Sequence, residues 1–191
     1  MRTLGVGLLL AASAFAGHNT SKKSSTDTAN VVDQDALGKL NSDVRQAINK
    51  LPYYGVFDDL SYSIDSAGVV TLSGETRTYV VRNSAISAVK DVPGVTRVED
   101  KIEILPLSPY DDNVRARAYN AIFNFPALSR YAINSRPPIR IIVNRGNVTL
   151  SGVVNNELDR TLIYNRVQVL PGVFSVKNDL RLDSDSNPPK S

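Results

Sequence analysis

Apolar positions between residues 35 and 106 follow a helical period and a strand period in turn, and each stretch predicts one element. Spacings of three and four residues predict helices, which Pro52 and Pro93 end. Alternation of apolar and polar residues predicts strands with one buried face. In chain order the predicted elements are a helix over 37–51, strands over 60–65 and 69–73, a helix over 76–90 and a strand over 95–104.

The same order repeats between residues 108 and 183. Ser108 can cap the first helix and Pro109 suits its first position. The predicted elements are a helix over 109–125, strands over 139–143 and 148–151, a helix over 155–170 and a strand over 174–182. The repeat is also literal: residues 68–74 recur at 146–152, an offset of 78 residues, with six of seven positions identical. A repeat of this length predicts two small domains that share one fold.

Six glycines recur in pairs at the offset of 78 residues, and we interpret all six as structural turn residues. The first pair lies in the turn between the two strands, the second where the chain bends from strand into helix, and the third just after the second helix. The pairs are Gly68 and Gly146, Gly74 and Gly152, and Gly94 and Gly172.

The ends of the chain have a different composition from the two copies. Residues 1–16 carry a basic residue, an apolar run and a small-x-small pattern, which predicts a secretory signal peptide. Residues 17–34 are polar and predict a flexible linker, and residues 184–191 predict a disordered tail. The domains are therefore expected at 35–106 and 108–183. We expect an exported, periplasmic protein, and the absence of cysteine leaves no site for a lipid anchor.

Residues for catalysis are scarce in this sequence. There is no cysteine, and the one histidine, His18, lies in the polar N-terminal stretch. Thiol chemistry, Ser-His-Asp triads and His-based metal sites therefore lack parts. We predict a protein that is not an enzyme, has no cofactor, metal site or small-molecule substrate, and does not bind nucleic acid because it is exported.

Charge separates the two copies. The first has eight bases against ten acids, a net charge of −2, and the second has ten bases against six acids, a net charge of +4. Basic residues interleaved with aromatic ones in the second copy suit an anionic lipid surface. In the alternative interpretation, the two aromatic residues of the helix pack against the first copy and the arginines are solvated. The candidate lipid-binding residues are Arg115, Arg117, Tyr119, Phe123, Arg130 and Tyr131.

Two units of this order, each with Gly-x-Val-Thr-Leu-Ser-Gly before its second helix and Pro-Gly-Val-x-x-Val after it, resemble tandem BON domains over about residues 37–182. The resemblance implies an α+β fold in which each αββαβ domain packs a three-stranded mixed sheet on two helices. It also implies a bacterial envelope module, linked to osmotic or envelope stress, that in some members binds anionic phospholipid through the second domain.

Together these observations predict a non-enzymatic periplasmic protein of envelope maintenance. Its expected partner is an anionic phospholipid surface, bound mainly by the second domain, with envelope proteins as a further class of partner. The alternative is a protein-interaction or chaperone-like stress module without lipid affinity.

Overall fold

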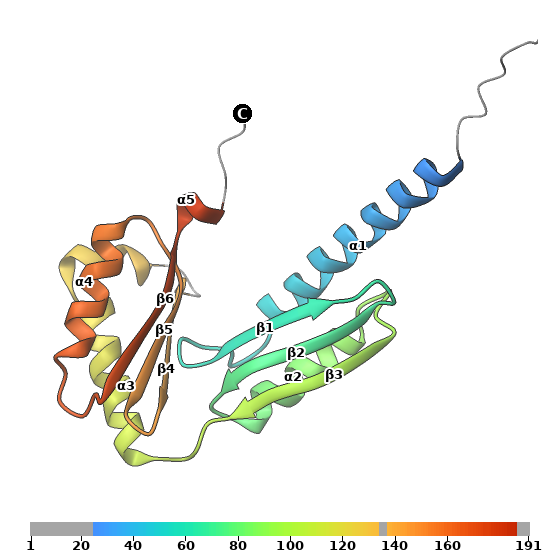
Figure 1. Ribbon diagram of the computed structural model, residues 1–191. Helices are drawn as coiled ribbons and strands as arrows, with labels where there is room; N and C mark the ends of the chain where they lie inside the picture. Colours follow the sequence, from blue (N-terminus) through green and yellow to red (C-terminus); the bar gives the residue numbers. More distant parts are fainter. Residues whose placement is uncertain (1–24, 134–136, 187–191) are drawn as a thin grey trace, which may run out of the picture.

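The computed structural model describes residues 25–133 and 137–186, and two units of like topology fill this range (Figure 1). The predicted signal peptide lies outside the described residues. The first unit consists of α1 (Ser25–Asn49), β1 (Asp59–Ile64), β2 (Val69–Thr76), α2 (Tyr79–Lys90) and β3 (Arg97–Ile104). The second consists of α3 (Pro109–Phe123), the 3-10 helix η1 (Pro126–Tyr131), β4 (Ile139–Asn144), β5 (Asn147–Val154), α4 (Glu157–Gln168), β6 (Ser175–Leu182) and the short α5 (Asp183–Ser186).

Each unit contains one three-stranded mixed sheet. The strand order is β1-β2-β3 in the first unit and β4-β5-β6 in the second. The first two strands of each sheet are antiparallel and the last two are parallel, joined by a helix as a parallel connection requires. The α+β class and the order αββαβ predicted from the sequence are confirmed.

The apolar face of each sheet packs against the helices of its own unit. In the first unit Val70 and Leu72 of β2 are buried with Val44 of α1 and Val81 of α2. In the second unit the equivalent strand positions pack with residues of α3 and α4. The opposite face of each sheet carries the polar residues of the alternating pattern, so the period-two signal in the sequence identified the buried face.

Most elements begin or end a few residues away from the predicted positions, and three differences change the interpretation. α1 begins at Ser25, inside the stretch predicted as a linker. Ser, Thr and Asp favour helix starts, and extending a helix that is already packed costs less than nucleating one. At the other end, α5 takes up the first residues of the predicted disordered tail. Gly74 and Gly152 lie within β2 and β5 rather than at a bend into a helix.

The loop between α1 and β1 joins the two units. Val56, on this loop, is buried in the core of the second unit, and its carbonyl accepts a hydrogen bond from Ile141 N at 2.8 Å. Arg140 donates to Gly55 O at 3.0 Å, and its guanidinium lies 4.7 Å from the centre of the Tyr54 ring. The two units therefore pack against each other through this loop.

A row of carboxylates crosses the polar face of the first sheet. Asp59, Glu75 and Glu103 occupy neighbouring positions on the three strands. Burial raises the pKa of Glu75, and the charges of Glu103 and Asp59 raise it further. Asp59 accepts a hydrogen bond from Ser151 of the second unit at 2.6 Å. Within the described ranges, no group of three or more such side chains is arranged to hold a metal ion.

We expect Glu75→Gln to stabilise the protein slightly at neutral pH. Because the folded pKa of Glu75 lies above its ordinary value, its charge opposes folding at a pH above the folded pKa. The gain should vanish when the pH falls below the ordinary glutamate pKa of about 4.3, where the carboxyl is protonated in both states. Urea unfolding between pH 7 and pH 4 measures this difference, and an equal gain at every pH would contradict it.

Candidate functional site at the turn end of the second unit

Arg115 is 3% exposed and cannot contact a membrane surface. Its guanidinium pairs with Asp112 at 2.7 Å and donates to Val143 O at 2.6 Å. The side chain therefore holds α3 against β4, which gives it a structural role instead of the expected lipid contact.

Tyr119 and Phe123 lie on the side of α3 that faces the interior. Phe123 is 3% exposed, and its ring centre lies 4.8 Å from that of Tyr119. Tyr119 in turn lies 6.2 Å from Phe57 of the loop that joins the units. This is the alternative that the sequence left open, in which the two rings pack toward the first copy.

Arg130 and Tyr131 are bound to Asp159, a buried carboxylate in the first turn of α4. The Tyr131 hydroxyl donates to Asp159 Oδ2 at 2.5 Å and accepts from Asn155 N at 2.9 Å, and Arg130 forms an ion pair with the same carboxylate oxygen. Burial acts to raise the pKa of Asp159, but the hydrogen bonds from Arg130 and Tyr131 outweigh it and lower the pKa. These contacts join η1 to α4.

Of the six candidate residues, Arg117 is exposed and contacts a turn that carries exposed apolar residues. It donates to Pro171 O at 2.7 Å, in the turn between α4 and β6. The six candidates therefore do not form one exposed face. Through this contact Arg117 belongs to one end of the second unit, where three chain segments meet: the start of α3, the β4–β5 turn and the α4–β6 turn. We call this region the turn end.

Asp111 holds the first two of these segments together. Its side chain is fully buried, and its two carboxylate oxygens accept hydrogen bonds from Arg145 N at 2.9 Å and Gly146 N at 2.8 Å. Arg145 has φ +52° and Gly146 has φ +77°, which suits the tight turn that Asp111 closes. The Arg145 side chain is left at the surface.

An aromatic pair covers the turn end. Tyr110 donates to Gly172 O at 2.8 Å, and its ring stacks on Phe174 with the ring centres 5.8 Å apart. Gly146 leaves room for Phe174, because a Cβ at Gly146 would lie 2.6 Å from the Phe174 ring. In spite of these contacts Phe174 is 73% exposed and Tyr110 is 45% exposed.

The surroundings of this pair are basic and apolar. Arg117 and Arg145 are exposed, and among the described residues neither forms an ion pair. Val169, two residues before Pro171, is 74% exposed. The turn end thus presents an exposed aromatic ring, an exposed aliphatic side chain and two exposed arginines.

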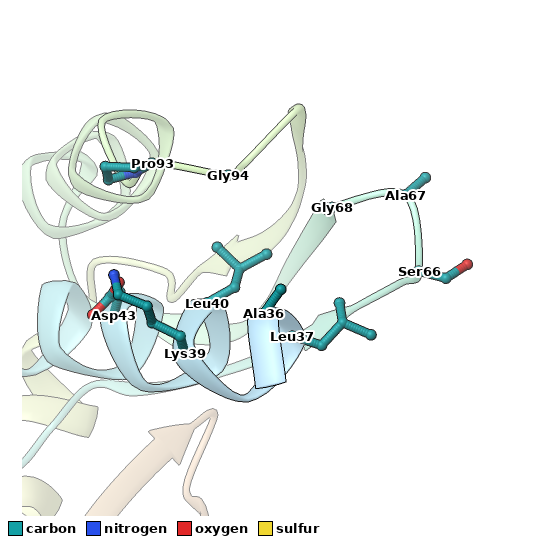
Figure 2. Close-up of a pocket in the computed structure, with 10 residues that line it drawn as sticks. All are labelled: Ala36, Leu37, Lys39, Leu40, Asp43, Ser66, Ala67, Gly68, Pro93 and Gly94. Atoms are coloured by element: carbon teal, nitrogen blue, oxygen red, sulfur yellow. The ribbon is translucent and has the colours of Figure 1, made fainter. Parts of the chain in front are cut away.

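The first unit has a groove at its own equivalent of the turn end. A groove of about 340 Å³ lies between α1, the β1–β2 turn and the α2–β3 turn (Figure 2). Leu37 and Leu40 of α1, Ala67 of the β1–β2 turn and Pro93 of the α2–β3 turn are among its lining residues. Lys39 pairs with Asp43 at 2.9 Å at its edge.

Two substitutions between the copies account for the groove. Leu40 lies against Gly94 as Val114 lies against Gly172, so Ala36 of α1 takes the place of Tyr110. Thr96 lies against the turn glycine of the first unit as Phe174 does in the second. The first unit therefore has a methyl group and a small hydroxyl side chain where the second has two aromatic rings.

Sequence reasoning missed Tyr110, Arg145 and Phe174. Phe174 was assigned to the apolar pattern of the last strand, although β6 begins one residue later. The available signal was the departure from the repeat: at the offset of 78 residues Phe174 replaces Thr96 and Arg145 replaces Ala67. These two departures from the repeat mark where the surfaces of the two copies differ.

The paired αββαβ units define a tandem-domain protein, and comparison with known families gives the class. The family model described as "BON domain" matches residues 37–106 and again residues 127–184. The chain therefore belongs to the BON-domain family. The second match begins after α3, although α3 occupies the place in its unit that α1 has in the first.

Among individual proteins, the chain is similar to the osmotically-inducible protein Y of Escherichia coli (strain K12). The two are 28% identical over 126 residues, which cover 64% of this chain and 61% of that protein. The chain thus spans about three fifths of the length of this relative.

Two solved structures of CdsD, a structural protein of the Type III secretion system of Chlamydia trachomatis, also match. One has 13% identity and a TM-score of 0.31, and covers 80% of this chain and all of that one. The other, the C-terminal domain, has 14% identity and a TM-score of 0.28, and covers 74% of this chain and 96% of that one. Likeness at this level carries no functional argument.

Proposed function

We propose that this protein is a periplasmic envelope protein that binds anionic phospholipid surfaces through the turn end of its second unit. The observation that carries the proposal is that the exposed Phe174 ring and the exposed Arg117 and Arg145 belong to the same end of the unit. An aromatic ring at headgroup depth and basic side chains near the phosphates are the two contacts that a peripheral membrane protein needs. None of the described helices combines the length and apolar character that crossing a bilayer requires.

The similarity to osmotically-inducible protein Y supports a link between this function and osmotic stress. Osmotically-inducible protein Y is named for osmotic induction, and both units of this chain contain a match to the BON domain model. A protein with this role would meet the envelope during osmotic stress. Contact with lipid headgroups would be reversible, since two arginines and one ring give a weak attachment.

The proposal predicts the effect of single substitutions on vesicle binding. Phe174→Ala should weaken binding to phosphatidylglycerol vesicles at least about tenfold, because burying a phenyl ring contributes about 1.5–3 kcal/mol. Arg117→Gln and Arg145→Asn should each weaken it several-fold at low salt, since one basic residue near an anionic surface contributes about 1 kcal/mol. Asn is chosen at 145 because it tolerates the positive φ of this turn. Co-sedimentation with vesicles measures all three.

Matched controls lie at the far end of α4. Leu158 is 76% exposed and Arg160 pairs with Glu157, so Leu158→Ala and Arg160→Gln remove one apolar and one basic side chain outside the turn end. Both should leave binding unchanged, and pure phosphatidylcholine vesicles should bind weakly. The proposal fails if the wild type ignores anionic vesicles at low salt. It also fails if the controls lose as much affinity as the turn-end variants.

A further inference from the structure

The groove of the first unit could accept the aromatic side chain that the turn end of the second unit exposes. The groove occupies the space that Tyr110 and Phe174 fill in the second unit. Its lining by Ala36, Leu37 and Leu40 is mainly apolar, which suits an aromatic side chain (Figure 2). Phe174 of another molecule offers such a side chain at 73% exposure.

The two surfaces also differ in charge. Lys39 and Asp43 line the groove and pair with each other, and two further carboxylates, Asp35 and Asp65, come directly before its lining residues Ala36 and Ser66. The exposed charges of the turn end are Arg117, Arg145 and Asp112, which already pairs with Arg77 and Arg115, whereas the carboxylate of Asp111 is buried against the backbone. Two carboxylates beside the groove therefore face two arginines outside any ion pair among the described residues, which favours contact between the two surfaces.

The groove and the turn end of one molecule lie far apart. Figure 1 places the β1–β2 turn, beside the groove, and the β4–β5 turn, within the turn end, at different extremities of the chain. A molecule therefore cannot fill its own groove, whereas both surfaces are open to other copies.

From these observations we propose that the protein associates head to tail, with the Phe174 side chain of one copy in the groove of the next. Such a contact is heterologous, so each bound copy still presents one free groove and one free turn end. Growth is then open-ended unless the chain of copies closes into a ring. The small groove limits each contact, so association is weak and appears at high protein concentration.

Two variants remove the two halves of this contact separately. Ala36→Tyr places in the first unit the ring that the second unit has at Tyr110, so it fills the groove with a side chain that this fold already accommodates. Phe174→Ala removes the side chain that enters the groove of the next copy. Each variant alone should associate at least tenfold more weakly than the wild type in sedimentation velocity over a concentration series. Circular dichroism checks that both are folded.

Mixing the variants gives the decisive result. Phe174→Ala keeps its groove and Ala36→Tyr keeps its Phe174, so an equal mixture should form a one-to-one dimer that grows no further. The proposal is overturned if the wild type stays monomeric throughout, if either variant associates like the wild type, or if the mixture does not form the dimer. Vesicle binding separates this proposal from the function above, because Ala36→Tyr should bind phosphatidylglycerol vesicles like the wild type.

Discussion

Gly152→Ala should destabilise the second unit by about 3 kcal/mol or more, one of the largest effects expected from a single methyl group in this protein. Gly152 has φ +113°, and a Cβ there would lie 1.9 Å from Pro138 O and 3.2 Å from Ile139 Cα. Both atoms belong to the backbone, so β4 must move away from β5 to admit the methyl group. Hydrogen exchange measured peptide by peptide should show the loss of protection in β4 and β5 first.

The first unit contains the same arrangement and gives an independent test. A Cβ at Gly74 would lie 2.1 Å from Asp59 O, so Gly74→Ala should destabilise the first unit by a similar amount. Gly38→Ala is the matched control, because the residue is in α1 and a Cβ there would meet nothing within 4 Å. That change should stabilise by about 0.5–1 kcal/mol through helix propensity. A Gly152→Ala protein as stable as the wild type would refute the role given to this glycine.

Asp159→Ala should cost about 2–4 kcal/mol, because it removes the acceptor shared by Arg130 and Tyr131. Tyr131 is 3% exposed, so its hydroxyl donor would be left buried without this partner. Chemical unfolding measures the loss. Tyr131→Phe should cost much less in the Asp159→Ala background than in the wild type, and equal costs in both would show that the two groups are not coupled.

The effect of Asp159 should depend on pH. Because its pKa is lowered on folding, the ionised carboxylate stabilises the protein above the unfolded pKa of about 3.9, and this contribution is lost as the pH falls through the folded pKa. The difference in unfolding free energy between wild type and Asp159→Ala should therefore be constant above about pH 5 and shrink below about pH 4. A difference that grows on acidification would contradict this assignment.

The fold was predictable because its signals are local and occur twice. Alternation in β2 and helical spacing in α2 each identified an element, and the recurrence of both in the second copy confirmed the pattern. Helix α1 was predicted too short, because residues 25–34 have no apolar stripe from which a helix could be recognised.

The site was less predictable because the local sequence pattern does not determine which polar and aromatic side chains are exposed to solvent. Arg115 and Arg117 are two residues apart on α3, yet one is buried against β4 and the other is at the surface. Which arginine faces inward depends on the carbonyl of Val143, which lies 28 residues further along the chain. In the same way, Phe174 fits an apolar strand pattern and is identified as a surface residue only once β6 is placed beside the β4–β5 turn.

The hydrogen bond from Ile141 to the carbonyl of Val56 makes the second unit depend on a residue that precedes it in the chain, and so in the order of synthesis. The core of the first unit, as far as it is described, is assembled from that unit's own residues, whereas the core of the second includes Val56. The ribosome completes the first unit before the second, so the residue that covers the edge of β4 is made before the strand that needs it. A chain cut between the units would leave the first with all the described residues of its core and the second without the residue that covers the edge of β4. Of two units with one fold, the earlier thus supplies part of the core of the later.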